Sequence, residues 1–381
     1  MAVGRDYSEG SKMKKLVLAI RALDVGGAEK QFIELAKYID KSKFEVTVCS
    51  MYGGEQEEIV KNISQIRYVN LQKTGRYDFY MFYKNYTALL KEIQPDVIYS
   101  FLGEMNLFSL WCKPKRTKTI WGFRASDKDW SKYGKVAQAV FWLQKKLSSH
   151  ADKIISNSYA SISYHEKHGF DMRRAVVIPN GIDSKKFQRN NEWRERFRAQ
   201  YHMKEGDVSI GMVARKDPIK GYTIFTKTAK KLLDKYDNLY FFAVGGGSEA
   251  IRQECEFILQ EYNAKKFFWL DNQNNIENIY SGLDISVSAS LGEGFSNSIA
   301  EAMSSALACV VTDVGDSALI VDNLGIVIKP NSAENLYHGI VEILNKEYKE
   351  LGKKGRMRIV ENFSIEKMVE NTEKEIVACV G

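Results

Sequence analysis

Short apolar runs alternate with longer amphipathic segments along the whole chain. The runs have the length of strands and the segments between them have the length of helices, which is typical of parallel sheets covered by helices. Strands are expected at KLVLAI, FEVTVCS, DVIYSF, TKTIWGF and DKIISNS in the first half, and at VSIGMVA, LYFFAVG, KKFFWL, LDISVSAS and ACVVTDV in the second. Because 381 residues exceed one ordinary core, we predict an α/β protein with two doubly wound, Rossmann-like domains that face a central cleft.

The two halves meet at VVIPNGIDSKKF, where Pro179, Asn180 and Gly181 interrupt regular structure. We predict an N-terminal domain over residues 13–183, a C-terminal domain over 184–365, and a helix over 366–381 that packs back on the N-terminal domain. Doubly wound domains bind ligands beyond the carboxyl ends of their strands. Candidate functional residues should therefore lie in the loops that follow the strands.

The net charge of +7 comes from the first half of the chain, where lysines and arginines gather over residues 101–150. The same stretch holds Trp130, Phe141 and Trp142. A basic and aromatic segment can dock on an anionic membrane surface. The alternatives are that the charges form a solvated helix face and that Phe141, Trp142 and Leu143 belong to the core.

Other features of the sequence limit the class of protein. No apolar stretch approaches the roughly 18–20 residues that cross a bilayer. The segment MAVGRDYSEGSK lacks the apolar core of a signal peptide, so we expect a cytoplasmic protein. The five cysteines form no C-x-x-C pair and the five histidines show no metal-ligand spacing, which argues against disulfides and a zinc site. We expect neither a metal ion nor a nucleic-acid partner.

A glycine pair follows the first expected strand. In RALDVGGAEKQF, Gly26 and Gly27 let the backbone approach a ligand, and a helix that begins near Ala28 points its free N–H groups at the cleft. A phosphate group could bind there, and an ordinary tight turn is the alternative. The chain lacks G-x-G-x-x-G and an acid at the end of the second strand, so an NAD-linked oxidoreductase rests on the architecture alone.

Two cations follow the first strand of the second half. In GMVARKDPIKGYTIF, Arg215 closes the strand and Lys220 comes five residues later, so a short turn at Pro218 can bring both cations to one place. A planar guanidinium and a compact ammonium together suit a diphosphate. The alternative is that Asp217 pairs with one of the cations on the surface.

Two carboxylates frame another loop between a strand and a helix. In LGEGFSNSIAEAM, Glu293 lies in the loop and Glu301 in the first turns of the helix that follows. Carboxylates accept hydrogen bonds from hydroxyls, so these acids could hold the ribose and the sugar of a nucleotide sugar while the cations take its phosphates. Ser298-x-x-Glu301 also fits a capping box, which would account for Glu301 alone.

The strand FFWL ends at Trp269 and Leu270, before a polar turn. A flat nucleobase could stack or form hydrogen bonds at this strand end. Aromatic packing in the core explains Trp269 equally well.

Five motifs together resemble those of the retaining glycosyltransferases of family 4, which have the GT-B fold, and they occur along the chain in the order expected for that family. The motifs are R-x-x-x-x-K-G (215–221), E-G-F-x-x-x-x-x-E-A-M (293–303), T-D-V-G (312–315), P-N-G-I-D (179–183) and G-G-A-E (26–29). The resemblance spans about residues 14–365. The two acids eight residues apart, together with the Arg and Lys pair, make it specific.

The resemblance implies a role for each of these positions. Glu293 would contact the donor sugar, Glu301 would hold the ribose hydroxyls, and Arg215 and Lys220 would neutralise the leaving diphosphate in place of a metal ion. Gly26 and Gly27 would approach the diphosphate from the opposite domain, and Leu270 would border the base. Backbone N–H groups near the sugar and diphosphate would come from Gly294, Phe295, Ser296 and Asn297. No cofactor is implied, and the sugar would keep its anomeric configuration.

One region departs from the common family pattern. Many members carry a histidine after a strand of the first domain, whereas this chain has TIWGFRASD with Arg124 there. Members that build cell-surface polysaccharides have S-F-L-P-x-x-N followed by a strand that ends in arginine, and YSFLGEMN with GFRASD is similar. Arg124 and a loop from Glu104 to Asn106 are therefore candidate acceptor-side residues.

These observations predict a retaining, metal-independent transferase that moves a hexose or N-acetylhexosamine from a UDP-linked sugar to a glycan or lipid-linked glycan in polysaccharide biosynthesis. Peripheral contact with the inner face of the cell membrane would fit a lipid-linked acceptor. Two alternatives remain open at this point. A glycoside hydrolase would use Glu293 and Glu301 as its acid and nucleophile, but it gives no reason for Arg215 and Lys220. A nucleotide-sugar sensor would bind the donor without turnover.

Overall fold

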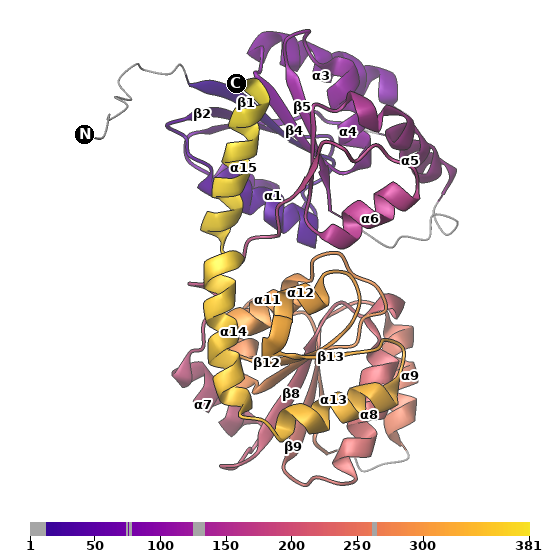
Figure 1. The fold of residues 1–381 in the computed structure, drawn as a ribbon, viewed down its shortest axis with the longest axis vertical. Coiled ribbons are helices and arrows are strands. Elements are labelled where there is room, and N and C mark those ends of the chain that lie inside the picture. The colour runs from indigo at the N-terminus through magenta and orange to yellow at the C-terminus, as the bar shows by residue number, and fades with distance from the viewer. Residues whose placement is uncertain (1–12, 74, 76–77, 125–133, 261–264) are drawn as a thin grey trace, which may run out of the picture.

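Two α/β lobes, each built on one parallel sheet, are stacked along the long axis of the molecule (Figure 1). The computed structural model describes residues 13–73, 75, 78–124, 134–260 and 265–381. The strands are β1 (Lys14–Ile20), β2 (Phe44–Ser50), β3 (Ile66–Asn70), β4 (Val97–Phe101), β5 (Lys118–Phe123), β6 (Lys153–Ser156), β7 (Ala175–Val177), β8 (Val208–Val213), β9 (Leu239–Val244), β10 (Phe267–Leu270), β11 (Ile285–Ser288), β12 (Ala308–Thr312) and β13 (Ile326–Ile328).

The helices of the N-terminal lobe are α1 (Gly27–Tyr38), α2 (Glu57–Lys61), α3 (Phe79–Ile93), α4 (Gly103–Cys112), α5 (Lys135–Leu147), the 3₁₀ turn η2 (Ser148–His150) and α6 (Tyr159–Lys167). Those that follow are α7 (Asn191–Gln200), η3 (Pro218–Lys220), α8 (Tyr222–Leu233), α9 (Glu249–Gln260), α10 (Ile276–Gly282), α11 (Asn297–Ser304), α12 (Ser317–Val321), η4 (Asp322–Leu324), α13 (Ala333–Leu344), α14 (Tyr348–Asn362) and α15 (Ile365–Val380).

The N-terminal lobe holds a seven-stranded sheet in the order β3-β2-β1-β4-β5-β6-β7. Helices cover both of its faces, so its central strands read as continuous apolar runs rather than as alternating patterns. On one face, Phe32 of α1 and Ile376 of α15 pack with strand residues such as Leu18. On the other face, Phe82 of α3 and Met105 of α4 close a second cluster.

The C-terminal lobe repeats this arrangement with a six-stranded sheet in the order β10-β9-β8-β11-β12-β13. Its strand β9, LYFFAV, is buried along its whole length. Phe241 packs with Phe225 of α8 and Leu336 of α13 on one face. Phe242 packs with Phe197 of α7 and Tyr280 of α10 on the other.

The strand order reverses once in each sheet, between β1 and β4 in the first and between β8 and β11 in the second. The loops that leave two such strands diverge to opposite faces, which opens a crevice at their carboxyl ends. The glycine pair lies where the chain passes from β1 to α1, and Leu102 with the first turn of α4 follows β4. The loops after β8 and β11 contain the two expected cations and Glu293. The topology therefore gathers the candidate residues at these two points.

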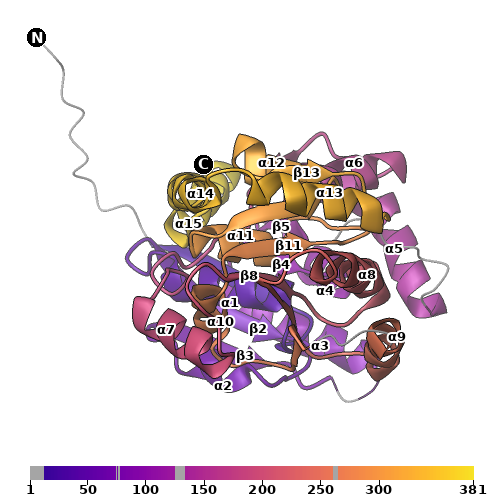
Figure 2. The ribbon, with the colours of Figure 1, turned by 90° about the horizontal axis from the view of Figure 1, so that it is seen from below.

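Two chain segments tie the lobes together. The linker residue Ile182 donates its N–H to the Phe363 carbonyl (2.8 Å) and accepts from the Ile365 N–H (3.2 Å), at the turn between α14 and α15. Helices α14 and α15 follow one another along the side of the molecule (Figure 1), and a view along its long axis shows them superposed (Figure 2). Helix α15 thus leaves the C-terminal lobe and packs on the N-terminal sheet beside α1.

The predicted fold class is confirmed, and every run predicted as a strand forms one. Three strands were not predicted, namely β3, β7 and β13. Two of these, β7 and β13, have three residues each, and all three lie at the edge of a sheet. Edge strands bury less apolar surface, so their sequence signal is weak.

Candidate functional site

The loop after β8 is held against the end of β11. Asp217 accepts a hydrogen bond from the Ile219 N–H (3.1 Å) and so caps the short turn η3. Gly221 follows with a left-handed backbone (φ 73°), and a Cβ at this position would lie 2.1 Å from the Ala289 carbonyl oxygen. Only glycine permits both the conformation and this close approach. The turn thereby places Lys220 beside the loop that carries Glu293.

Glu293 is fixed by neighbours from three segments. Its Oε1 accepts from Lys220 Nζ (2.6 Å) and from Ser290 Oγ (2.7 Å). Its backbone packs on Gly315 of the T-D-V-G motif, where φ is 58° and a Cβ would lie 2.4 Å from the Glu293 carbonyl oxygen. The carboxylate side chain is 11% exposed and that of Lys220 is 24% exposed, so this ion pair is largely shielded from solvent.

The two cations that follow β8 have different carboxylate partners in the structure. Arg215 has a side chain that is 72% exposed and pairs with Asp217 at 3.3 Å. Within the described part of the chain, Lys220 rather than Arg215 pairs with Glu293. The surface pairing considered as an alternative for Asp217 therefore holds for Arg215. The diphosphate role of both cations stays a prediction.

Glu301 reaches across to the N-terminal lobe. Its Oε1 lies 2.5 Å from Lys30 Nζ of α1, and its Oε2 accepts from the Tyr280 hydroxyl at 3.4 Å. The capping-box interpretation is wrong, because α11 begins at Asn297 and residue 296 is its N-cap, which leaves Ser298 inside the helix. The carboxylate thus contacts Lys30 and Tyr280 rather than the helix start.

The N-termini of α1 and α11 face one another between the lobes. Gly26 is the N-cap of α1 and makes no side-chain cap. A Cβ on Gly27 would lie 3.3 Å from Asn297 Nδ2, the first residue of α11. Two opposed helix N-termini with free N–H groups form a site that favours an anion.

The loop between Glu293 and α11 contributes mainly backbone. The Gly294 carbonyl accepts from the Asp316 N–H (2.9 Å). The Phe295 ring is buried and packs at 5.5 Å from Phe363. Ser296 is buried, with its hydroxyl 3.2 Å from that of Ser298. These side chains shape the loop, and their positions leave ligand contacts to main-chain groups.

Trp269 and Leu270, the last two residues of β10, make different contacts. Trp269 is partly buried, packs against the core and stacks on Tyr222 with 5.9 Å between ring centroids. Leu270 accepts the Gly245 N–H at 2.8 Å through its carbonyl and is half-buried at the end of the strand. Beyond it, buried Lys216 pairs with Asp271 at 3.0 Å, and this hydrogen bond lowers the pKa of the Asp271 carboxyl.

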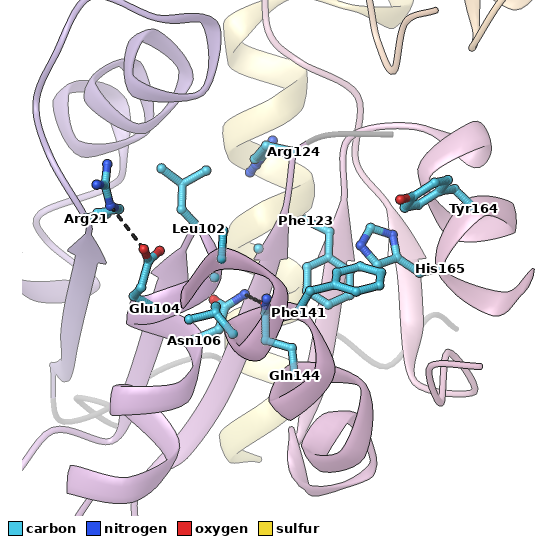
Figure 3. Close-up of a pocket in the computed structure, with 14 residues that line it drawn as sticks. Arg21, Leu102, Glu104, Asn106, Phe123, Arg124, Phe141, Gln144, Tyr164 and His165 are labelled. Carbon is cyan, nitrogen blue, oxygen red and sulfur yellow. Dashed lines mark hydrogen bonds and ion pairs between the residues drawn. The ribbon is translucent and has the colours of Figure 1, made fainter. Parts of the chain in front are cut away.

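A cavity of about 420 Å³ lies in the N-terminal lobe, at the reversal point between β1 and β4 (Figure 3). Arg124 lies over the Phe101 ring at 4.4 Å, and its Nη2 donates to the buried Tyr99 hydroxyl at 2.7 Å. Glu104 pairs with Arg21 at 3.3 Å on the wall of the cavity. The predicted acceptor-side residues Arg124, Glu104 and Asn106 thus all line this cavity.

The predicted loop from Glu104 to Asn106 is wrong, because these residues form the first turn of α4. Asn106 is fully buried, accepting from Ser100 Oγ (2.8 Å) and donating to Gln144 Oε1 (3.2 Å). Asn106 therefore lines the cavity with an amide that two hydrogen bonds hold in place. The helix starts here because β4 ends at Phe101 and the chain turns at the reversal point.

A polar chain joins the cavity to the cleft between the lobes. Arg124 Nη1 donates to Asn180 Oδ1 (3.2 Å), and Asn180 Nδ2 donates to Asn297 Oδ1 (2.8 Å). Asn180 belongs to the P-N-G-I-D motif, whose Gly181 exchanges two hydrogen bonds with the Gln31 side chain (2.8 and 3.0 Å). The linker is thus part of the site as well as a connection.

Asp316 closes a further contact between the lobes. Its two carboxylate oxygens accept from the N–H groups of Tyr159 (2.8 Å) and Ala160 (2.9 Å) at the start of α6. Burial raises the pKa of this carboxyl, while the two N–H groups act in the opposite direction.

Several of these residues were not predicted from the sequence. Lys30, Arg21 and Gln144 carry no motif, and their partners lie far away along the chain. Asn180 was noted as a break in regular structure and as part of the P-N-G-I-D motif, but its contact with Asn297 was not predicted. A usable signal existed for Lys30 alone, because it follows the G-G-A-E motif directly.

Some residues of the basic segment 101–150 stabilise the fold through ion pairs and packing. Lys113 and Lys118 both pair with Asp152, at 3.2 and 3.1 Å. Phe141 packs against the core, as the alternative expected, whereas the Trp142 side chain is 56% exposed. Trp130 lies outside the described residues. In the part of the chain that the structure describes, none of the helices is both long and apolar enough to span a bilayer.

Comparison with known proteins agrees with this architecture. Residues 25–186 match the family model described as Glycosyltransferase Family 4, and residues 207–346 match Glycosyl transferases group 1. An Escherichia coli enzyme, UDP-Gal:alpha-D-GlcNAc-diphosphoundecaprenol alpha-1,3-galactosyltransferase, is 29% identical over 210 residues, a match that covers 52% of this chain and 53% of that enzyme.

Solved structures show the same fold. HepE of Anabaena in complex with UDP-glucose is similar with a TM-score of 0.81, 17% identity, and coverage of 96% of this chain and 100% of that one. A glycosyltransferase from Rickettsia africae is similar with a TM-score of 0.79, 19% identity, and coverage of 96% and 99%. The two family models, matched in order along two Rossmann-like lobes, indicate that this chain is a glycosyltransferase with the GT-B fold.

Proposed function

We propose that this glycosyltransferase moves a hexose or N-acetylhexosamine from a UDP-linked donor to a lipid-linked glycan, with retention of anomeric configuration, in polysaccharide biosynthesis. The observation that carries the proposal is the pairing of Lys220 with Glu293 at the reversal point of the C-terminal sheet, within a cleft that also holds Glu301 and two helix N-termini. Cations and N–H groups for a diphosphate and acids for hydroxyls are what a nucleotide sugar requires.

Each part of the donor has a candidate contact. Glu301 accepts hydrogen bonds from the ribose hydroxyls while Tyr280 holds its other oxygen. The N–H groups at the starts of α1 and α11 bind the diphosphate, and Lys220 turns from Glu293 toward the leaving phosphate. Exposed Arg215 leaves Asp217 and also binds the diphosphate. Its ion pair with Asp217 lies on the surface and contributes little free energy, so breaking it costs little. Glu293, released from Lys220, holds hydroxyls of the donor sugar.

The transfer step needs no metal ion in this scheme. The bond from the anomeric carbon to the phosphate oxygen breaks, and its electron pair leaves with UDP. The acceptor hydroxyl oxygen forms the new bond on the same face, and its proton passes to the departing phosphate. Negative charge grows on the diphosphate during this step, so the cations stabilise the transition state more than the bound donor.

The acceptor proposal draws on similar proteins. The Escherichia coli relative is named for transfer to N-acetylglucosamine linked to diphosphoundecaprenol, and HepE was solved with UDP-glucose. A lipid-linked acceptor places the enzyme at the inner face of the cell membrane. The exposed side chain of Trp142 and its neighbour Lys146, which lies 5.9 Å from that ring, support peripheral contact through α5.

Variants of the two cations test the proposal. Lys220→Ala should lower turnover with UDP-sugars on the order of 10²–10³-fold, comparable to the loss of one preorganised donor, and Arg215→Ala should lower it in the same direction. Lys227→Ala, an exposed lysine of α8, is the matched control. Unchanged turnover in both variants would contradict the diphosphate role.

The same assays separate the alternatives. A sensor would bind UDP-sugars without consuming them, and a glycoside hydrolase would release sugar from a glycan with no need for a nucleotide donor. Transfer that is unaffected by a chelator supports metal independence, and loss of transfer on chelation would refute it. Binding to anionic vesicles should fall with added salt, and vesicles that bind no protein would refute membrane contact.

A further inference from the structure

Asp316 is the N-cap residue of α12, but its side chain does not cap that helix. An aspartate at this position usually accepts a hydrogen bond from the first turn of its own helix, and Asp316 makes no such bond. Its two carboxylate oxygens accept instead from the N–H groups of Tyr159 (2.8 Å) and Ala160 (2.9 Å) in the other lobe. Asp316 is only 5% exposed. The buried carboxylate therefore serves the contact between the lobes rather than its own helix.

The first turn of α6 takes hydrogen-bond acceptors from both lobes. Ser158, the N-cap residue of this helix, accepts the Ser161 N–H at 3.1 Å through its hydroxyl oxygen. The N–H groups of Tyr159 and Ala160 have no acceptor within the helix, because the first N–H groups of an α-helix precede its first turn of hydrogen bonds. Asp316 supplies the acceptors for both. The start of α6 is thus completed by a residue of the C-terminal lobe.

The backbone of Asp316 is joined to the loop that carries Glu293. The Asp316 N–H donates to the Gly294 carbonyl at 2.9 Å. Thr312, which begins the T-D-V-G motif just before Asp316, donates its hydroxyl to the Ser290 carbonyl at 2.7 Å. These two hydrogen bonds hold the segment before α12 along the loop on both sides of Glu293. Asp316 is therefore fixed to the loop that we propose for the donor sugar.

Helix α6 forms part of the wall of the N-terminal cavity. Its residues Tyr164 and His165 both line the cavity (Figure 3). The His165 ring stacks on Phe123 with 4.2 Å between ring centroids, and Arg124 follows Phe123 directly. The Asn157 N–H, just before the helix, donates to the Phe123 carbonyl at 3.2 Å. A shift at the start of α6 would therefore move the cavity wall that we propose for the acceptor.

The contact between Asp316 and α6 lies apart from the linker between the lobes. The linker residue Ile182 is bonded to the turn between α14 and α15. Figure 1 shows α6 and α12 to the right of that turn, where the two lobes meet. A linker alone allows one lobe to rotate about the other, as in hinge motions of two-domain proteins. A second contact at a distance from the linker restricts that rotation.

We propose that Asp316 is a positioning residue, which aligns the acceptor hydroxyl with the donor sugar by holding α6 against the loop of Glu293. The two reacting groups are bound to different lobes in the proposed reaction, so the distance between them depends on how the lobes are joined. A misplacement of about 1 Å can slow a reaction roughly 10²-fold. This proposal rests on the transferase function proposed above, since it concerns the alignment of that step.

A matched pair of variants at Tyr159 tests the contact from the N-terminal lobe. Tyr159 is the first residue of α6, where proline is well tolerated, and Ser158 before it is extended (φ −155°, ψ 151°), as a residue before proline requires. Tyr159→Pro removes the N–H donor, whereas Tyr159→Ala keeps it, and both remove a ring that is 58% exposed. Tyr159→Pro should lower kcat on the order of 10- to 100-fold with little change in the KM of the donor, and Tyr159→Ala should keep the wild-type kcat. Equal kcat in the two variants would overturn the proposal.

Asp316→Asn tests the same contact from the C-terminal lobe. The asparagine oxygen can accept one N–H, but its amide nitrogen would face the other donor, so kcat should fall as in Tyr159→Pro. Asp237→Asn, at an exposed position between α8 and β9, is the matched control. A contact that only stabilises the fold would lower the Tm of Asp316→Asn and leave kcat unchanged while the protein is folded. That result would refute the positioning role.

Hydrogen exchange tests the contact between the lobes without any transfer reaction. The amides of Tyr159 and Ala160 should be protected in the wild type and exchange faster in Asp316→Asn, because α6 itself offers them no acceptor. Fast exchange of both amides in the wild type would refute the contact and the proposal with it. Protected amides in a wild type that transfers no sugar would refute the transferase function, and the positioning role with it, and would leave the contact between the lobes established.

Discussion

The ion pair between Lys30 and Glu301 predicts that the N-terminal lobe helps to hold the nucleotide. Lys30 Nζ lies 2.5 Å from Glu301 Oε1, with 37% of the lysine side chain and 10% of the carboxylate side chain exposed. Lys30 also lies 4.8 Å from the Phe187 ring centre. Glu301 retains lone pairs for ribose hydroxyls beside its contacts to Lys30 and Tyr280. Lys30→Met would therefore disorder the carboxylate and remove a positive charge from the donor site.

The size of the effect follows from the burial of the pair. A hydrogen bond between charged groups contributes about 1.5–3 kcal/mol. Water can reach the Lys30 side and screen the charge, so the lower end of this range applies. A loss of about 1.5 kcal/mol corresponds to roughly tenfold in Kd. We expect calorimetry to show UDP binding about tenfold weaker in Lys30→Met, with kcat at saturating donor changed little.

A control on the same helix separates this effect from general destabilisation. Lys37 of α1 is exposed and lies in the last turn, away from Glu301, so Lys37→Met should bind UDP as the wild type does. UDP affinity within twofold of the wild type in Lys30→Met would refute the reasoning and reduce the pair to a structural contact. Tighter binding would show that Lys30 competes with the ribose for the carboxylate.

Three further predictions concern the supports of the site. Asp316→Ala removes the acceptor of two N–H groups at the start of α6 and should lower the free energy of unfolding by about 1–2 kcal/mol, measured in urea, whereas Asp237→Ala, at an exposed position between α8 and β9, should change it little. Gly221→Ala should cost more stability and activity than Gly206→Ala, because both glycines are left-handed but only Gly221 meets a carbonyl oxygen; equal losses would contradict the close approach. Lys216→Met should return the lowered pKa of Asp271 toward its ordinary value in an NMR titration, and should remove the part of the stability that is present above the ordinary carboxyl pKa and lost as pH falls through the lowered one.

The sequence allowed the fold and the loops of the site to be predicted because both depend on local patterns. Buried parallel strands are continuous apolar runs, so β1 and β9 were recognisable without their neighbours. The loop containing Glu293 was recognisable because a glycine and an acid follow a strand end. The errors arose where a local sequence pattern was compatible with two different structures. Ser298 and Glu301 fit a capping box, yet the helix starts before Ser298.

The contacts that make one site of two lobes could not be predicted in this way. Lys30 and Glu301 are 271 residues apart, and Asn180 and Asn297 are 117 apart. Which side chains meet across the cleft depends on how the linker and α15 orient the lobes, and no periodicity in the sequence encodes that orientation. The P-N-G-I-D motif marked the linker, but the contacts of Asn180 with Arg124 and Asn297 form only when both lobes are folded.

Hydrogen bonds across the lobes connect the reversal points of the two sheets, and this connection should couple the binding of the two substrates. Arg124 lines the cavity of the N-terminal lobe, and two hydrogen bonds connect it through Asn180 to Asn297 at the start of α11. The helix whose N-terminus faces the proposed diphosphate site is therefore held in part by a residue of the cavity that we propose for the acceptor. An acceptor that moves Arg124 must alter the hydrogen bonding of Asn297, and a donor that engages α11 must alter the hydrogen bonding of Arg124. By linkage, each substrate should then change the affinity of the other by the same factor, and Asn180→Ala should remove that mutual effect while each substrate still binds alone.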